Sequence, residues 1–519
     1  MRADPERTPV LVAAGQSESR DGSALPLDLM ENAVLEALEG RPGLGQAIER
    51  CSVVNVLTRR SGPAPASDLA KRLGIAPAIL ETTSVGGNTP QALVTRAATD
   101  IALGRLSASL IAGAEAVRTG RLTGAPARGR AEGSGGLGAA AETAEPSPAP
   151  DPVVGSYRQD LSDEERAAGL IIPVQVYPLI ESVLATRAGR GPAEQRGYLG
   201  EILAPFSEVA AANPHAWFRD ALTADEIATV TPGNRLVAEP YTKRMTAFLG
   251  GAQGAAVVVC SLATAQRLGV DDGAVFVWAG ASCDDVWYPV ARPDLGASPA
   301  IAAAGRAVLD AAGAAIGDVG LFDLYSCFPS AVQLGAEALG LGLGEPGRLT
   351  LTGGLPYFGG PGNNYTTHAL AALFERMRGG GQGLGLVSAL GWYATKHAIG
   401  LYGSSPPPRG FLEGDTADAQ RRIDASALPV LPLGETIPVE GSSAAGAEAT
   451  VDASTVFYDR AGEPIAAPVY ATLRDGRRLA AAVEPVDLAS VSGTFLVGAR
   501  IAVTGTKDGS SPTYRVITR

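Results

Sequence analysis

The sequence predicts an α/β protein built from a duplicated unit and followed by a small all-β domain. Between residues 9 and 115, short apolar runs typical of strands alternate with segments of helical spacing, which indicates a parallel sheet covered on both faces. A similar succession of helix, strand and helix returns between residues 301 and 340. Beyond about residue 435 the pattern is one of alternating strands alone.

The first repeat contains the clearest helix signals. A strand-like run over residues 82–85 leads into a pair of glycines, and a helix follows. Asn88 is a favourable N-cap residue, and Gln91 stands at the capping-box position. Gly104 then stops the helix.

The second repeat shows an elbow of the same kind. A strand over residues 319–324 runs into residues 325–328 (Tyr-Ser-Cys-Phe), and the next helix opens with Pro329 and ends near Gly340. The first elbow, residues 86–88, likewise joins a strand to a helix with an early proline and a final glycine. We therefore interpret the two elbows as copies of one another.

The remaining segments set the domain boundaries. Residues 119–152 are rich in Gly, Ala, Pro and Ser and have little to bury, so we expect a flexible insertion. The expected units are residues 1–118 and 251–405 for the duplicated α/β core, 119–250 for a loop or insertion domain, 406–434 for a linker and 435–519 for the C-terminal β-barrel.

The C-terminal segment predicts a small barrel of OB type, because five short strand-like runs follow one another in about eighty residues. It lacks the basic and aromatic groove that single-stranded nucleic acid needs, which favours a structural or protein-docking role. The strand-like runs are residues 449–458, 464–473, 477–483, 494–503 and 514–517.

Composition argues against several classes of function. The chain has 519 residues, a net charge of −12 and no cluster of Lys and Arg, which disfavours nucleic acid as a partner. The N-terminus has no apolar signal region, and no apolar stretch is long enough to span a bilayer, so we expect no membrane contact. The four cysteines have no CxxC spacing, so we expect free thiols in a reducing cytoplasm and no metal site.

Two glycine-rich segments are candidates for ligand binding. Gly86-Gly87-Asn88 stands where a strand feeds a helix N-terminus, and free backbone amides there can hold an anion or a carbonyl oxygen. Residues 353–365 are dense in Gly, Pro, Asn and Tyr, which allows close backbone approach to a ligand. Phosphate-loop, HExxH and Gly-x-Ser-x-Gly motifs are absent from the sequence.

Residues 8–15, residues 113–116, the elbow at residues 325–328 and the loop at residues 353–365 occur in the order found in thiolases. Residues 391–393 then follow a strand, where thiolases place their last motif. Over residues 5–405 the chain resembles the thiolase superfamily, and it is most similar to actinobacterial type-1 thiolase-like proteins, which carry an extra C-terminal domain and are related to sterol-carrier-type thiolases. The resemblance implies a duplicated thiolase fold in αβαβα layers. It also implies an acyltransferase of the acetyl-CoA acetyltransferase type, acting on coenzyme A thioesters in lipid metabolism.

The resemblance further implies that the usual catalytic set is missing. The nucleophilic cysteine of thiolases falls at Gly86, one motif histidine at Tyr325, the other at Gly360, and the final cysteine near Trp392. A thiolase needs a thiolate to accept the acyl group and a base to move a proton from carbon. These residues supply neither thiolate nor imidazole, so we do not expect the usual thiolase activity.

Other residues remain as candidates. The catalytic candidates are Tyr325, Cys327, Tyr365 and His397. Two of them have a structural alternative, since Cys327 can be a packing thiol and His397 a structural histidine. Of the other histidines, His368 is expected to pack and His215 is not assigned. The candidates for binding substrate or CoA are Gly87, Asn88, Lys243, Asn363 and Asn364.

Three functions stay open. The first is an acyl-CoA-binding protein without a tightly bound cofactor, whose ligand is CoA or an acyl-CoA. The second is an aldolase-type lyase on a CoA thioester, using Tyr325, Tyr357 or Tyr365 as acid–base groups. The third is a non-catalytic scaffold or partner subunit. We expect a monomer or homodimer, with a protein partner possible through the C-terminal domain.

Overall fold

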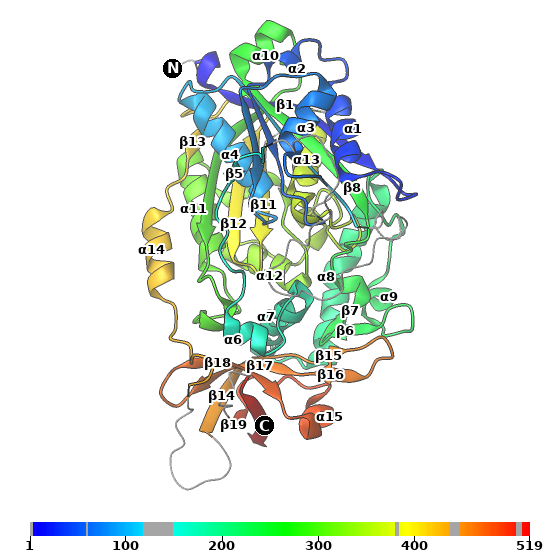
Figure 1. Ribbon diagram of the computed structural model, residues 1–519, viewed down its shortest axis with the longest axis vertical. Coiled ribbons are helices and arrows are strands. Elements are labelled where there is room, and N and C mark those ends of the chain that lie inside the picture. Colours follow the sequence, from blue (N-terminus) through cyan, green and yellow to red (C-terminus); the bar gives the residue numbers. More distant parts are fainter. Residues whose placement is uncertain are drawn as a thin grey trace.

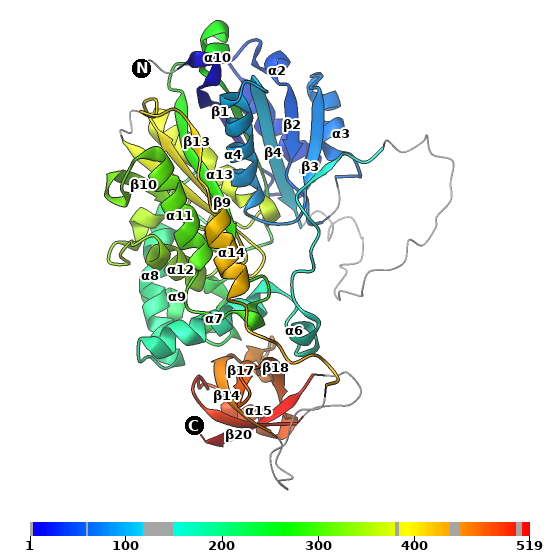
Figure 2. The ribbon, with the colours of Figure 1, turned by 90° about the vertical axis from the view of Figure 1, so that its left-hand side faces the viewer.

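The computed structural model describes residues 4–58, 61–117, 149–378, 383–435, 447–504 and 511–518. Its α/β core fills one end of the molecule, the helices of the loop domain lie in the middle, and the C-terminal barrel forms the other end (Figures 1 and 2). The insertion expected at residues 119–152 lies mostly outside the described residues. No helix in the described part of the chain is long and apolar enough to cross a bilayer.

One 11-stranded sheet runs through the core in the order β10-β11-β12-β9-β1-β8-β4-β2-β3-β5, and β13 pairs with β9. Its strands are mostly buried along their whole length, as expected for a sheet covered on both faces. They are β1 (Pro9–Glu18), β2 (Arg50–Val53), β3 (Ile79–Thr83), β4 (Ala108–Ala116), β5 (Val153–Val154), β8 (Ala252–Ser261), β9 (Val275–Asp284), β10 (Val319–Asp323), β11 (Leu384–Gly391), β12 (Lys396–Gly403) and β13 (Leu412–Glu413).

The sheet order confirms the duplicated fold. In the first half β8 is antiparallel to both β1 and β4, and β4 is parallel to β2. In the second half β12 is antiparallel to both β9 and β11, and β11 is parallel to β10. The halves join where β1 pairs with β9.

The interpretation of the two elbows as copies is wrong in detail. The elbow at residues 325–328 follows β10, whose counterpart in the first half is β2 and not β3. The elbow at residues 86–88 follows β3 and leads into α4 (Thr89–Ala102). The counterpart of α4 is α13 (Tyr365–Arg378), because both helices pack against strands of both halves. The two elbows have similar local sequence patterns, but they follow strands at different positions in the two halves of the sheet.

Helices and sheet stack in five layers. The helices α4 and α13 form the central layer between the two halves of the sheet. The helices α1 (Pro26–Leu38) and α3 (Pro65–Leu73) cover the outer face of the first half, and α11 (Pro299–Ala312) covers that of the second. Because α4 is enclosed, polar positions such as Gln91 are fully buried.

The start of α4 differs from the predicted capping box. Asn88 is the N-cap residue, but its side chain makes no capping hydrogen bond. Gln91 accepts a hydrogen bond from the Tyr402 hydroxyl at 2.7 Å. The Gln91 side chain therefore bonds Tyr402, which is distant in sequence, whereas the local pattern predicted that it would cap the helix.

The loop domain and the C-terminal domain share a small sheet of order β16-β15-β6-β7. This pairing fixes the barrel domain against the loop domain. The loop domain contains α6 (Asp163–Ala167), α7 (Pro173–Arg187), α8 (Pro192–Ala212), α9 (Ala224–Ala228), β6 (Leu236–Ala238) and β7 (Tyr241–Thr242), and the C-terminal domain supplies β15 (Phe457–Tyr458) and β16 (Pro464–Ala466).

The C-terminal strands close into a barrel of order β14-β17-β18-β20-β19, which confirms the small all-β domain. The run expected at residues 494–503 becomes a strand only from Arg500, after a turn at Gly498 with φ of +83°. The segment expected as a linker contributes β13 and α14 (Ala417–Ala425), and Gln420 of α14 bonds the backbone of Asp284. The barrel strands are β14 (Ala447–Ser454), β17 (Pro468–Leu473), β18 (Arg478–Val483), β19 (Arg500–Thr504) and β20 (Thr513–Thr518).

Candidate functional site

A cavity of about 910 Å³ lies where both elbows meet the loop domain, and we call it the elbow cavity. Its buried end is formed by the two elbows and the β11–β12 turn, and its exposed end by residues 232–249 and the C-terminal domain. Residues of the buried end include Gly86, Gly87, Tyr325, Cys327, Asn363 and Trp392; those of the exposed end include Gly233, Arg235, Lys243 and Arg460.

Neighbouring side chains fill the space where residues 86 and 87 would carry their own. Gly86 has φ of +153°, and a Cβ atom built on it would lie 2.6 Å from the Lys396 Nζ. A Cβ on Gly87 would overlap the Tyr325 hydroxyl and lie 2.5 Å from the Leu390 carbonyl oxygen. Glycine is therefore required at both positions in this arrangement.

Lys396 brings an ammonium group to the first elbow. Its Nζ donates a hydrogen bond to the Val85 carbonyl oxygen at 2.5 Å, and the residue is only 8% exposed. The Trp392 ring centroid lies 5.7 Å from the Nζ. Burial lowers the pKa of Lys396, and the charge of Asp284 partly opposes that shift. Sequence reasoning did not nominate this residue.

Tyr325 and Cys327 both face the elbow cavity from the second elbow. No hydrogen bond of the Tyr325 hydroxyl is found within the described ranges, and burial raises the pKa of Tyr325 above its ordinary value. Burial also raises the pKa of the Cys327 thiol to about 12. A thiol with that pKa carries almost no thiolate at neutral pH, so Cys327 is a poor nucleophile here.

The β11–β12 turn is held in a strained conformation. Trp392 and Ala394 have φ of +59° and +53°, values that non-glycine residues seldom adopt. The Tyr177 hydroxyl donates to the Trp392 carbonyl at 3.1 Å and accepts from the Ala394 amide at 3.0 Å. Tyr177, from α7, thus keeps Trp392 at the cavity wall, a role that sequence reasoning missed.

His397 lies behind this turn and does not line the elbow cavity. Its Nε2 lies 3.1 Å from Asp285 Oδ2 and 3.2 Å from the Ala394 carbonyl oxygen. Burial opposes ionisation of Asp285, but hydrogen bonds from His397 and Ser298 and the nearby positive charges hold its pKa below the ordinary value. This geometry favours a role in supporting the turn.

Among the binding candidates, Gly87, Lys243 and Asn363 line the elbow cavity. Asn363 positions the first elbow, because its Oδ1 accepts from the Gly86 amide at 3.0 Å and its Nδ2 donates to the Asn55 carbonyl at 2.8 Å. The amide of Gly87, beside it, makes no hydrogen bond within the described residues and is free for a ligand oxygen.

Several other candidates lie outside the cavity lining. The Tyr365 hydroxyl is engaged by Thr352 at 2.5 Å and Asp323 at 3.1 Å. Asn364 donates to the Gly113 carbonyl at 2.5 Å, and the Gly360 amide donates to the Phe248 carbonyl at 2.8 Å. Asn88 and Tyr357 are also outside it, and His368, as expected, packs in the core, against Gln16. The contacts of Tyr365, Asn364, Gly360 and His368 favour structural roles for these four residues.

The exposed end of the elbow cavity is basic. Arg235, Lys243 and Arg460 line it, and the Lys243 and Arg460 side chains make no ion pair within the described ranges. The one carboxylate in the lining, Asp160, pairs with Arg166 outside it. Clustered cations without carboxylate partners suit a phosphorylated ligand. Sequence reasoning did not nominate Arg235, which comes from the loop domain, or Arg460, which comes from the barrel domain.

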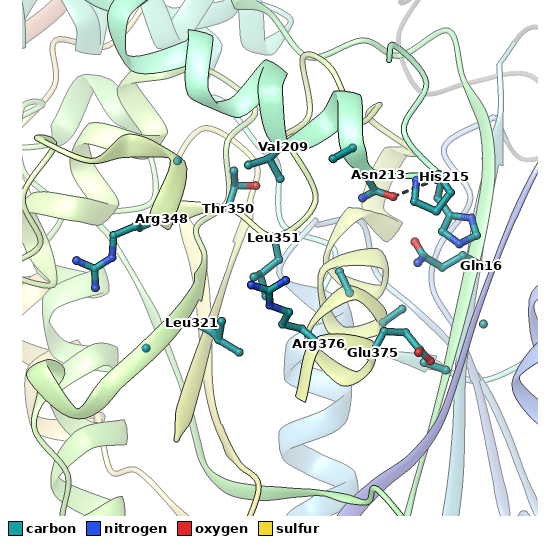
Figure 3. Close-up of a pocket in the computed structure, with 18 of the residues that line it drawn as sticks. Gln16, Val209, Asn213, His215, Leu321, Arg348, Thr350, Leu351, Glu375 and Arg376 are labelled. Carbon is teal, nitrogen blue, oxygen red and sulfur yellow. Dashed lines mark hydrogen bonds between the residues drawn. The ribbon is translucent and has the colours of Figure 1, made fainter. Parts of the chain in front are cut away.

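A second cavity of about 910 Å³ lies between the end of α8, β1 and α13. Figure 3 shows Glu375 and Arg376 projecting from α13, with Asn213 and His215 at the end of α8. A hydrogen bond with Glu18 at 3.1 Å raises the pKa of His215. Neither elbow contributes to this second cavity. No group of three or more potential metal ligands occurs among the residues described.

The duplicated αβαβα core, with a cavity at its elbows, has the fold of the thiolase superfamily. No family model and no curated protein matches the chain. Among solved structures it is similar to a monomeric SCP2-thiolase like protein type 1 from Mycobacterium smegmatis, with 29% identity over 99% of both chains and a TM-score of 0.80. That likeness includes the C-terminal domain.

Two further solved structures share the fold over 77% of this chain. An Ltp2-ChsH2(DUF35) aldolase is 18% identical, with a TM-score of 0.57, and matches 77% of this chain and 99% of its own. An acetyl-CoA acetyltransferase from Syntrophomonas wolfei is 16% identical, with a TM-score of 0.54 and the same coverage. At these identities the likeness concerns the fold.

Proposed function

We propose that the chain binds acyl-CoA thioesters in the elbow cavity and does not turn them over by the usual thiolase route. The observation that carries the proposal is one cavity joining unpaired cations at its exposed end to a free elbow amide at its buried end. Arg235, Lys243 and Arg460 would hold the phosphates of CoA. The Gly87 amide and the Tyr325 hydroxyl would face the thioester carbonyl.

The absence of thiolase chemistry rests on the elbow geometry. Gly86 offers no nucleophile, and the nearby Cys327 thiol has a pKa of about 12. Gly360 and Trp392 supply no acid or base where the resemblance places them. Binding and the usual turnover are therefore separable in this protein.

Isothermal titration with CoA and acetyl-CoA tests the proposal. Lys243→Ala combined with Arg460→Ala should weaken binding at least tenfold and flatten its salt dependence, because each removes a phosphate contact. Lys71→Ala is the matched control, since Lys71 is an exposed lysine on α3, outside the cavity lining. No binding at millimolar ligand would refute the proposal.

An aldolase-type lyase remains a second candidate, and one observation favours it. Of the three phenols considered, only Tyr325 lines the elbow cavity, and no described residue bonds its hydroxyl. A free phenol can hand a proton to, or take one from, a ligand oxygen. Tyr325→Phe should abolish any retro-aldol activity that a screen of 3-hydroxyacyl-CoA thioesters finds, whereas Tyr357→Phe should not.

We infer that the barrel is of OB type and serves docking within the chain. Its closed order 1-2-3-5-4 and the helix α15 (Leu488–Val491) between the third and fourth strands support this inference. The monomeric state named for the Mycobacterium smegmatis relative, and the pairing of β5 with the edge strand β3, favour a monomer. We also place the protein in the cytoplasm, in lipid metabolism, on the strength of the superfamily.

A further inference from the structure

Lys396 is a buried cation directly behind the lining of the elbow cavity, and acyl-CoA binding does not require it. It opens β12, directly opposite Asp284 of β9, and its side chain crosses to the first elbow. The Nζ lies where the side chain of residue 86 would stand. A lysine is costly to bury, so its position over a ligand cavity calls for a reason beyond packing.

Lys396 is not among the residues that line the cavity, and its amine lies directly behind three residues that do. Val85, Gly86 and Trp392 all line the elbow cavity, and each of them adjoins the Lys396 ammonium. Any larger residue at position 86 would displace the amine and also screen it from a ligand. The position of the Lys396 amine therefore depends on the glycine at position 86.

We propose that Lys396 is an amine nucleophile that forms a Schiff base with the carbonyl group of a ketone or aldehyde held in the elbow cavity. An amine must be neutral to attack a carbonyl carbon, and burial favours the neutral amine. The hydrogen bond to the Val85 carbonyl oxygen holds the Nζ in place, and the charge of Asp284 only partly opposes the lowering of the Lys396 pKa. The proposal uses the elbow cavity and is independent of whether the ligand carries CoA.

The step balances with water as the co-reactant. The Nζ lone pair forms a bond to the carbonyl carbon, and the carbonyl oxygen takes a proton to give a carbinolamine. Loss of that hydroxyl group as water gives the iminium ion. In a β-hydroxy ketone, the C–C bond electrons then move to the iminium nitrogen while the hydroxyl proton leaves to a base, releasing an aldehyde. Protonation of the enamine carbon and addition of water return the amine.

Two polar groups are placed to assist this step. Asn88 Oδ1 is buried without a hydrogen-bond partner among the described residues, beside the point that a Gly86 side chain would occupy. It can accept a hydrogen bond from the carbinolamine hydroxyl or from the iminium N–H. The Tyr325 hydroxyl lies against Gly87 and can carry the proton between oxygen atoms.

The test uses 2,4-pentanedione on the full-length protein, because this diketone forms a stable conjugated enaminone with a reactive amine and needs no reductant. The chain has only four lysines, at positions 71, 243, 396 and 507, so peptide mass mapping assigns the label without ambiguity. At pH 7.5 we expect Lys396 to react at least tenfold faster than Lys71, and Lys396→Met to lose the near-ultraviolet absorbance of the enaminone.

The outcomes are distinct. Labelling confined to the exposed lysines, or equal rates at Lys396 and Lys71, would overturn the proposal. The labelling rates are measured in the wild-type chain, so they stand even if a Lys396 variant does not fold. Slower labelling of Lys396 by prior addition of acetyl-CoA would place the two ligands in one cavity.

The probe carries no CoA, so this experiment and the calorimetric titration fail independently. If Lys396 is labelled but the protein has no affinity for CoA, the acyl-CoA-binding proposal is refuted and the amine-nucleophile proposal stands. If the protein binds CoA but Lys396 is not labelled, the amine-nucleophile proposal is refuted and the acyl-CoA-binding proposal stands.

Discussion

The two elbows of the cavity differ in where their side chains come from. The second elbow keeps its own, because Tyr325 and Cys327 point into the space beside their backbone. In the first elbow Gly86 and Gly87 have none, and their space is filled by Lys396 and Tyr325 from the other half of the duplicated fold and by Asn88 of the elbow itself. The facing half therefore supplies side chains where Gly86 and Gly87 have none, and the two halves interlock at the site.

This difference explains why motif positions alone mislead. Read along the chain, Gly86 looks like a deletion of function, since glycine offers no reactive atom. In space, the same glycine admits a lysine that stands 311 positions from Val85, the residue it bonds. The chemistry of the first elbow should therefore be sought on the β11–β12 turn and not at the helix start.

The largest expected effect comes from giving the first elbow a side chain where backbone blocks it. Gly87→Ala would push a methyl group against the Tyr325 hydroxyl and the Leu390 carbonyl, and the carbonyl cannot move without disturbing β11. We expect a loss of about 3 kcal/mol in unfolding free energy, by analogy with overpacked cores. Urea denaturation measures it, with Gly342→Ala, which meets nothing within 4 Å, as control. A loss as small as that of the control would mean that Tyr325 and the Leu390 carbonyl move aside at little cost.

A smaller effect tests whether Gly86 and Lys396 form one unit. Gly86→Ala should destabilise the protein, because the new methyl group lies 2.6 Å from the Lys396 Nζ. Adding Lys396→Ala removes that overlap and leaves only the one with Asn88 Oδ1, so the double variant should lose less than the sum of the two single losses, by about 1–2 kcal/mol. A double-mutant cycle in urea measures this coupling. If the two losses in unfolding free energy were strictly additive, Gly86 and Lys396 would be independent, and Lys396 would not be filling the side-chain space of Gly86.

The alternation of strands and helices was enough to predict the α/β class, the duplication and the C-terminal barrel, because burial periodicity is local. The prediction that the two elbows are copies was wrong because a local pattern carries no information on the order of strands in the sheet. By its neighbours in the sheet β10 is the counterpart of β2, although the loop after β10 looks like the loop after β3. The Gln91 capping box was likewise lost to a partner, Tyr402, that is distant in sequence.

For the site, the resemblance directed attention to residues that do line the cavity, among them Gly86, Tyr325, Cys327 and Trp392. Lys396 and Tyr177 were not predicted, because each reaches the site from an element whose direction is set by packing. The rarity of lysine in the chain was the one available signal for Lys396. Tyr365 and His397 show the opposite case, since motif positions and proximity did not reveal that their polar atoms are engaged in the core.

The smallest expected effect concerns the thiol that the second elbow has kept. Because the pKa of Cys327 is raised to about 12, the folded protein favours the neutral thiol, and this preference is lost only as pH rises past the ordinary thiol value of about 8.5 towards 12. Between pH 7 and 8, alkylation by iodoacetamide should therefore be far slower in the folded chain than in urea, and should accelerate above pH 9. Mass mapping of the peptide containing Cys327 follows the reaction.

Cys327→Ala should lower the unfolding free energy by only about 1 kcal/mol, since it removes one buried sulfur. It should leave acetyl-CoA affinity within about twofold of the wild type, because a neutral thiol contributes no charge to the ligand. Cys51, buried in β2 far along the sheet, is the matched thiol, and its pKa is also raised to about 12 by burial. If Cys327 were alkylated at pH 7 while Cys51 stayed intact, a nearby base would have to activate it, and the second elbow would be the reactive one after all.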